Sequence, residues 1–184
     1  GLDAAVIEAI IAKHDACIGD SLIKVLTFNS GDPAAAQEGK KAEEAAAAAD
    51  KASQLASLDA HLTANLGQPE GETTGESNDD LIAWIGTSCA ALDAATIART
   101  IMRCCLETAS PDHAAPKITK QIERRKALLM KWNHTGTEPD MLRAQAACLY
   151  EVQAFCGRKG WPQGLIKKIF YNLYETDIVF EDAY

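Results

Sequence analysis

Hydrophobic residues recur at three- and four-residue spacing through most of the chain, and this spacing is typical of amphipathic α-helices. The clearest case follows Thr137, where Leu142, Ala146, Leu149 and Val152 share one face. No stretch alternates apolar and polar residues in the way that a half-buried strand does. The pattern predicts an all-α fold of antiparallel helix pairs that are joined by short polar turns.

A change in composition divides the chain into three parts. Residues 67–77 are rich in Gly, Thr, Ser and Glu, which is typical of a linker or loop. We therefore expect N-terminal helices over 1–66 and a C-terminal helical domain over 78–184. Within this domain Asn78 and Asp93 are the predicted N-caps of the first two helices.

The N-terminal part is predicted to hold helices of a different character. Apolar positions within 3–28 indicate two helices that separate near Gly19. Residues 34–66 are rich in Ala, Lys and Glu and have high helix propensity. The first half of this stretch is either a solvated helix or a mobile insertion. A single apolar face is defined by four leucines: Leu55, Leu58, Leu62 and Leu66.

One basic helix is predicted over 118–132. We interpret its polar side as a solvated face, and the alternative is contact with an acidic segment of this chain or of a partner. The basic residues are Lys117, Lys120, Arg124, Arg125, Lys126 and Lys131. We also expect Trp161 to pack on the helix that follows it. One continuous core is predicted to include Trp84, Ile101, Leu129, Leu149 and Phe170.

The chain has 18 Lys and Arg residues against 26 Asp and Glu residues, which gives a formal net charge of −8. This balance argues against direct binding to nucleic acid and favours partners with basic segments. No apolar run is long enough for a membrane span, so we expect no membrane association. The six cysteines form no C-x-x-C pair, so we expect reduced thiols without disulfides in a cytoplasmic protein.

Residues with catalytic potential do not form a recognisable motif. The four histidines are scattered, and no zinc-protease or phosphate-binding motif occurs. The carboxylates near the C-terminus lie in one short stretch without a visible division into an acid and a base. We therefore expect no enzyme activity, no metal site and no cofactor.

The final ten residues mix aromatic side chains with carboxylates and contain no Lys or Arg. If 177–184 forms a helical turn, Asp177 and Glu181 share a face and can meet Lys or Arg side chains of a partner. The alternative is an ordinary solvated helix end. The candidate partner-binding residues are Tyr174, Glu175, Asp177, Phe180, Glu181, Asp182 and Tyr184.

Three segments together resemble a known domain: residues 147–153 (ACLYEVQ), residues 161–166 (WPQGLI) and the acidic end. They are similar to the C-terminal HEAT domain, of the aromatic/acidic-box type, of translation initiation factor 4 gamma or its death-associated paralogue. The resemblance covers roughly 78–184. Family members continue into further helices with a second box, so the resemblance implies either a chain truncated before its last helices or a source protein that diverges there.

The resemblance implies a HEAT-like stack and a non-catalytic protein-interaction role in a translation initiation scaffold. The implied partners are the basic segment of a MAP-kinase-interacting kinase or of the initiation factor 2 beta subunit. The box matches Tyr174, Glu175, Asp177, Glu181, Asp182 and Tyr184 of this sequence. Two alternatives remain: a guanine-nucleotide-exchange-type module that acts on initiation factor 2, and a purely structural helical domain.

Overall fold

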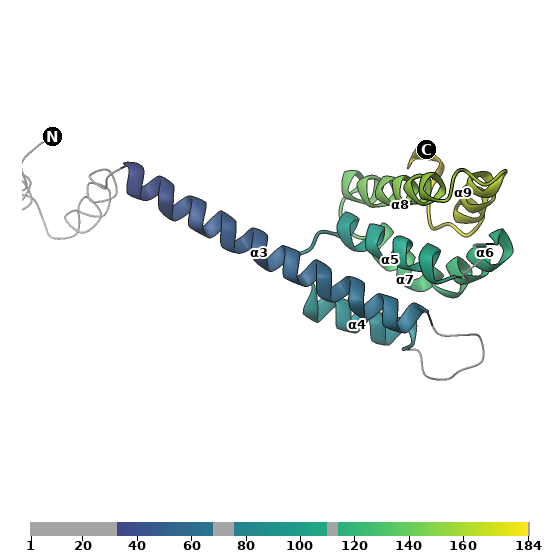
Figure 1. The fold of residues 1–184 in the computed structure, drawn as a ribbon, viewed down its shortest axis with the longest axis horizontal. Helices are drawn as coiled ribbons and strands as arrows, with labels where there is room; N and C mark the ends of the chain where they lie inside the picture. Colours follow the sequence, from purple (N-terminus) through teal and green to yellow (C-terminus); the bar gives the residue numbers. More distant parts are fainter. Residues whose placement is uncertain (1–32, 68–75, 110–113, 184) are drawn as a thin grey trace, which may run out of the picture. The chain divides into compact units, whose positions relative to one another are not determined.

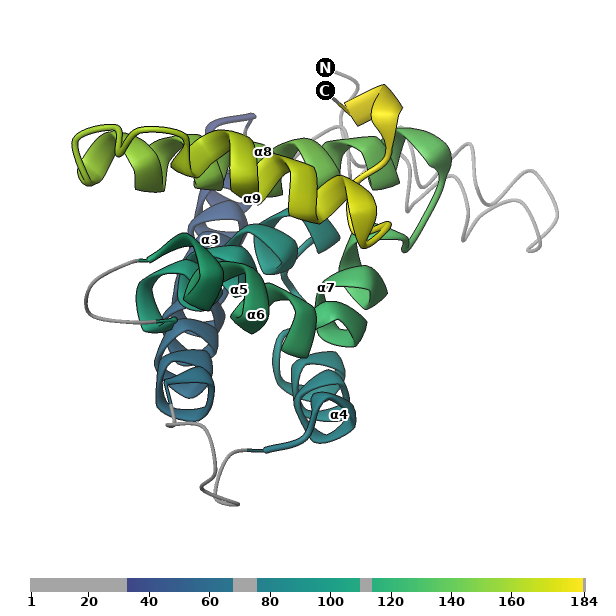
Figure 2. The same cartoon turned by 90° about the vertical axis from the view of Figure 1, so that its right-hand side faces the viewer.

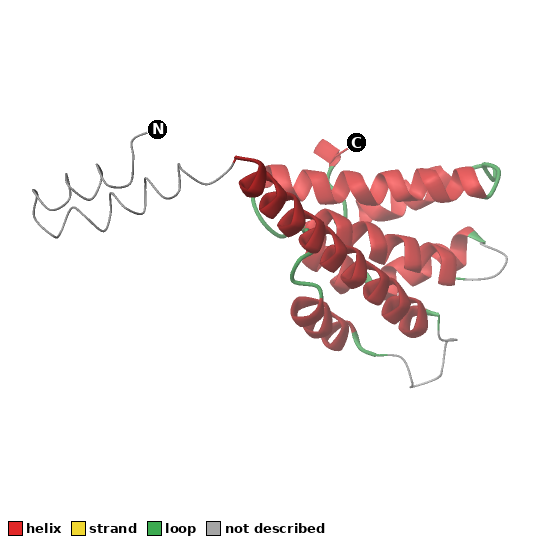
Figure 3. Cartoon of the chain, turned by 60° about the vertical axis from the view of Figure 1, so that its left-hand side comes forward, coloured by secondary structure: helices red, strands yellow, loops and turns green. Residues whose placement is uncertain are grey.

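A computed structural model describes residues 33–67, 76–109 and 114–183, and every regular element in these ranges is helical (Figure 3). The all-α prediction is therefore confirmed. The two helices expected over 3–28 lie outside the described residues. The helices are α3 (Pro33–Leu66), α4 (Asn78–Ser88), α5 (Ala94–Thr108), α6 (Ala115–Arg124), α7 (Lys126–Asn133), α8 (Glu138–Arg158), α9 (Leu165–Glu175) and the 3₁₀ helix η1 (Glu181–Ala183).

The chain divides into two compact units, Gly1–Ala48 and Ala49–Tyr184, and the boundary lies inside α3. The boundary predicted from composition lies later, at the linker over 67–77. In the first unit the structure describes only the beginning of α3. Residues 44–53 of this helix are exposed, which agrees with the solvated helix for that stretch. High Ala content explains why it is helical without an apolar face.

In the described part of the second unit the helices form three consecutive pairs (Figure 1). The second half of α3 pairs with α4, and α8 pairs with α9. In the middle pair, the second helix is divided at Arg125 into α6 and α7, and both pack against α5. Figure 2 shows the α8–α9 pair on one side of α5, α6 and α7, with α4 and the end of α3 on the other side. Each pair therefore contacts only its neighbours along the chain, as in stacked helical repeats.

The first helices of neighbouring pairs run parallel to each other. Between α5 and α8, Cys148 Sγ lies 3.5 Å from the Ala98 carbonyl oxygen, and Arg158 pairs with Glu107 at 3.0 Å. The second contact lies later in the sequence than the first on both helices, so α5 and α8 run in the same direction. The second helix of each pair returns in the opposite direction (Figure 1).

The same parallel order relates α3 to α5. Asp59 Oδ1 accepts a hydrogen bond from Arg103 Nη2 at 2.5 Å, and Gly67 at the end of α3 lies beside Thr108 at the end of α5. Repetition of one geometry across three pairs supports a stack. The HEAT-like assignment itself stays a prediction.

Side-chain caps begin the helices at polar residues. Ser77, and not Asn78, is the N-cap of α4, and it forms a capping box with Asp80. Asp93 caps α5 as predicted, because its carboxylate accepts a hydrogen bond from the Thr96 amide at 2.7 Å. Ser77 was missed because three consecutive polar residues follow it, and each of them is a plausible cap.

The prediction of one basic helix over 118–132 is wrong in one respect, because two helices, α6 and α7, meet at Arg125. Arg125 is also buried, whereas the sequence placed it on a solvated face. Its guanidinium donates hydrogen bonds to the Glu76 carbonyl, the Asn78 side chain and the Asn65 carbonyl. These acceptors flank residues 68–75, so Arg125 ties together the two ends of the α3–α4 connection. Burial lowers the pKa of Arg125.

The core runs through all three pairs. Ile101, Leu129 and Leu149 are buried, and Trp84 and Phe170 are half-buried against the same cluster, so the predicted core is confirmed. Three of the four leucines predicted on α3 are buried, and Leu55 is exposed. The α3 leucines in the core are Leu58, Leu62 and Leu66.

The five cysteines in the described ranges are buried free thiols. Burial raises the pKa of Cys104 to about 12 and that of Cys148 to about 12, so both stay protonated at neutral pH. Cys148 and Cys156 lie on α8, as predicted. No described helix combines the length and the apolar run that crossing a bilayer requires.

Shortening a core leucine tests the packing of the α5–α8 layer. Leu149 is 5% exposed, so Leu149→Ala removes buried methyl groups and leaves a cavity. We expect the free energy of unfolding to fall by about 2–5 kcal/mol. Leu55→Ala is the matched control, since Leu55 is 36% exposed and should lose much less. Denaturant unfolding monitored by circular dichroism measures both, and equal losses would contradict this core.

Candidate protein-interaction surface

Helix α9 is the second helix of the last pair, and one side of it is buried. Leu165, Ile169 and Leu173 recur every four residues and enter the core. Asn172 Nδ2 donates a hydrogen bond to Glu123 Oε1 of α6 at 2.9 Å. These contacts leave the opposite side of α9 as the outer side.

The turn before α9 does not have the predicted packing. The Trp161 amide donates to the Cys156 carbonyl at 2.8 Å, and the backbone of Gly160 and Trp161 is left-handed. The Trp161 ring lies beside Gly157 of α8. Trp161 therefore covers the preceding helix, and the prediction that it packs on the following helix is wrong. The left-handed backbone at Gly160 and Trp161 turns the Trp161 side chain back toward α8.

Aromatic side chains line the outer side of α9. A shallow groove there is formed by Ile166, Lys167, Phe170, Tyr171 and Tyr174. Tyr171 is 63% exposed and Tyr174 is 48% exposed. Among the predicted site residues, Tyr174 is thus on an accessible apolar surface.

The segment after α9 consists of turns and bends over residues 176–179, so 177–184 is not the single helical turn that would place Asp177 and Glu181 on one face. Asp177 adopts a left-handed backbone conformation with φ of 54°, and only residues 181–183 form a 3₁₀ turn. Ile178 and Val179 are buried, and their amides bond to the Leu173 carbonyl at 3.1 and 3.2 Å. Burial of these two side chains forces the chain to bend at Asp177, which a continued helix would not allow.

A buried glutamine fixes the end of this segment. The Phe180 amide donates to Gln145 Oε1 of α8 at 2.8 Å, and Gln145 Nε2 donates to the Asn133 carbonyl at 3.4 Å. The Phe180 ring stacks on His134 with ring centroids 4.6 Å apart. Gln145 therefore connects the end of α7, the helix α8 and the C-terminal segment through both ends of its amide.

The four carboxylates of the predicted site are all exposed. Glu175 ends α9, Asp177 lies at the bend, and Glu181 and Asp182 lie on η1. None of the four forms an ion pair with another residue that the structure describes. Tyr184 lies outside the described residues. The structure therefore places the predicted carboxylates at one end of the last pair, with unpaired negative charge.

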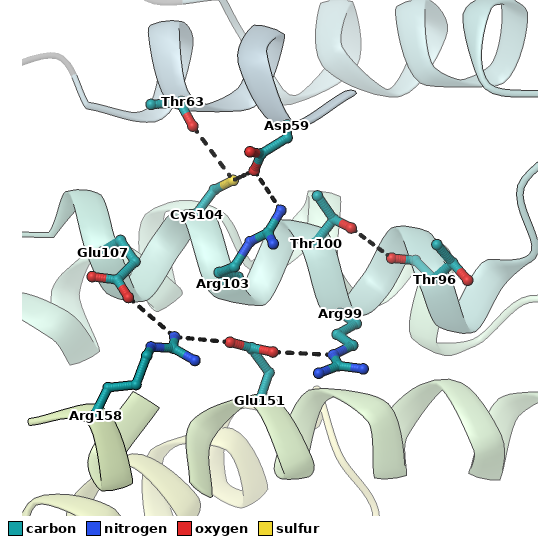
Figure 4. Close-up of polar contacts among 10 residues, drawn as sticks. All are labelled: Asp59, Thr63, Thr96, Arg99, Thr100, Arg103, Cys104, Glu107, Glu151 and Arg158. Carbon is teal, nitrogen blue, oxygen red and sulfur yellow. Dashed lines mark hydrogen bonds and ion pairs between the residues drawn. The ribbon is translucent and has the colours of Figure 1, made fainter. Parts of the chain in front are cut away.

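A second polar group, between α5 and α8, has a different character (Figure 4). Glu151 is 3% exposed, and its two oxygens lie 3.0 Å from Arg99 Nε and 3.0 Å from Arg158 Nη2. Arg158 reaches Glu107 as well. Each carboxylate of this group has a cationic partner, so the group holds two helices together and leaves no charge for a ligand.

The described residues hold no group of His, Cys, Asp and Glu side chains that could bind a metal ion. Comparison of the sequence with protein-family models and with curated proteins finds no match. The described residues define an all-α fold of helix pairs with an acidic and aromatic end.

The sequence missed the polar residues that position this surface, namely Gln145, Asn133 and His134. One signal was available, since Gln145 lies between Leu142 and Leu149 on the predicted inner face of α8. A polar residue on an apolar face needs a hydrogen-bonding partner. Its partners come from the α7 end and from Phe180, and the helical period does not reveal them.

Replacing Gln145 tests how the terminus is held. Gln145→Met keeps the shape but leaves the Phe180 amide and the Asn133 carbonyl without a partner, which costs about 1–3 kcal/mol. We expect faster hydrogen exchange at the Val179 and Phe180 amides. Gln153→Met on the exposed side of α8 is the matched control and should change neither. Unchanged exchange at Phe180 in the first variant would contradict this role for Gln145.

The pKa of Tyr171 reports on the charge of Glu175. A hydrogen bond to the Glu175 carboxylate, followed by its negative charge, raises the pKa of Tyr171. Both effects favour the protonated phenol, so removing the charge must let the phenol ionise at a lower pH. We expect Glu175→Gln to lower the pKa of Tyr171. The pKa is measured by ultraviolet titration, and the titration curve of the Tyr171→Phe variant is subtracted to isolate the signal of Tyr171. A pKa that stays the same would show that the two side chains do not interact.

Proposed function

We propose that this chain is a non-catalytic interaction domain whose acidic C-terminal surface binds a Lys/Arg-rich segment of a partner protein. The observation that carries the proposal is the set of exposed carboxylates without ion-pair partners among the described residues: Glu175, Asp177, Glu181 and Asp182. Glu151 and Asp59 of the second unit, by contrast, have arginine partners.

Position supports a binding role for this surface. Ile178 and Val179 are buried and Gln145 holds the Phe180 amide, so Asp177 just before them and Glu181 and Asp182 just after them have a fixed place. A surface that is already ordered loses less conformational entropy when a partner binds. Tyr174 and Phe180 add apolar contact area, and apolar contacts of this kind slow dissociation while charge speeds the encounter.

The resemblance of the sequence extends the proposal to a particular setting. We propose a scaffold of translation initiation and its regulation, in the cytoplasm, that recruits a MAP-kinase-interacting kinase or the initiation factor 2 beta subunit. The stack of helix pairs supports this setting because the resembled domain is of the HEAT type. The Lys-rich segments of these two partners have the charge that the acidic surface requires.

The strength of such a contact follows from its exposure. An exposed ion pair contributes about 0–1 kcal/mol, so several pairs have to act together. Charges on an open surface are screened over about 8 Å at physiological salt. Binding should therefore weaken when the salt concentration increases.

Charge reversal tests the proposed function. We expect the double variant Glu181→Lys, Asp182→Lys to weaken binding of a Lys-rich peptide by about tenfold or more at low salt, since two attractions become repulsions. Asp177 is better changed to Asn, because its left-handed backbone suits Asn and disfavours Lys. Titration calorimetry at low and high salt measures the affinity.

The matched control reverses two exposed carboxylates of the first pair, Asp50→Lys and Asp79→Lys. It changes the net charge by the same amount and should leave the site intact. Equal loss of binding in both double variants would mean that only net charge matters. Binding that survives the first variant and does not respond to salt would reject the acidic surface as the site.

A further inference from the structure

We propose that the outer side of α9 docks a partner's amphipathic helix whose two ends carry opposite charge. Its acidic end lies over Lys167 and Lys168, and its basic end lies over Glu175 and Asp177. This inference rests on the proposed function, because the basic end is the segment that meets the acidic surface. It adds the conformation of the partner, its apolar spacing and the polarity of its charges.

The first observation is the shape of the groove. Ile166, Phe170 and Tyr174 recur every four residues along one side of α9, at steps of about 6 Å. Tyr171 and Lys167 complete the lining. Apolar side chains spaced by three and four residues on a second helix fit between ridges of this spacing. Figure 2 shows α9 on the last layer beside α8, where the described chain adds no further helix over it.

The second observation is the order of charges along α9. Lys167 and Lys168 lie in the first turn, and Glu175 is the last residue of the helix. This order is the reverse of the one that stabilises a helix, because the helix dipole favours anions at the N-terminus and cations at the C-terminus. Each of these three charges therefore adds to the potential of the helix end at which it lies. Lys167 lines the groove, whereas Lys168 and Glu175 line the adjoining hollow between α9 and α6, and Tyr171 belongs to both. This joined surface is positive at the beginning of α9 and negative at its end.

Charge complementarity selects the partner. A nucleic acid is negative along its whole length and would be repelled by Glu175 and Asp177. A uniformly basic peptide would be attracted by Glu175 and Asp177 but repelled by Lys167 and Lys168, so it matches only one end of this surface. A helix with carboxylates at one end, apolar residues in its middle and Lys or Arg at the other end matches the whole surface.

Two synthetic helical peptides of about 18 residues and identical composition test this inference with the full chain. Both carry Leu at four-residue spacing. The segregated peptide has Glu in its first turns and Lys in its last turns, whereas the alternating peptide mixes them. We expect the segregated peptide to bind about tenfold more tightly, as two exposed ion pairs acting together would give. Equal affinity for the two peptides would overturn the inference.

The α9 lysines provide the decisive variants. Lys167→Glu with Lys168→Glu should remove the advantage of the segregated peptide, and Lys126→Glu with Lys131→Glu on α7 is the matched control. A nitroxide at the Lys end of the peptide should broaden the amide signals of Glu175 and Asp177. Broadening at Lys167 and Lys168 instead would overturn the proposed polarity.

A Lys-rich peptide without apolar residues separates this inference from the proposed function. If it binds the acidic surface and the segregated peptide gains nothing, the helix site is rejected and the proposed function stands. If the Lys-rich peptide does not bind while the segregated peptide binds and loses affinity in the Lys167→Glu, Lys168→Glu variant, the proposed function fails and the helix site is supported.

Discussion

The buried carboxylate of Glu151 sets the register on which the last two helix pairs depend. A charge that is almost fully buried is tolerated only with close partners, and Arg99 and Arg158 approach it from two sides. Arg99 lies on α5 and Arg158 ends α8, so sliding one helix along the other by a turn would separate Arg99 from Glu151. Apolar packing between the two helices is less selective for one position, because apolar side chains of similar volume can replace one another at modest cost.

That register determines where the C-terminal surface forms. With α8 fixed, Gln145 lies beside the end of α7, and its amide can reach Asn133 on one side and Phe180 on the other. Ile178 and Val179 then fill the space next to α8 and α9. The acidic residues are held outward as a consequence, since their neighbours in the sequence are buried. The position of the negative charge is therefore a result of core packing.

The parts of this fold that the sequence predicted are those with local causes. The helical period identified the apolar faces, and Asp93 was recognised as a cap because capping needs only residues within one turn. The break at Arg125 and the bend at Asp177 were missed because each serves distant groups. Arg125 bonds to Asn65, and the bend lets Ile178 enter a core built by other helices. Of the candidate surface, the carboxylates were predicted, but the side chains that hold them were not.

The charged side chains of α9 do not decide whether the helix forms, so their order along the helix is not set by folding. Burying Leu165, Ile169 and Leu173 stabilises it by about 1.5–3 kcal/mol per side chain. Three charges placed against the helix dipole cost about 0.3–1 kcal/mol each. Burial therefore exceeds the electrostatic cost severalfold, and exchanging Lys167 and Glu175 would leave α9 folded. A charge order that folding does not require, and that even opposes it slightly, supports the helix site that we propose on the outer side of α9.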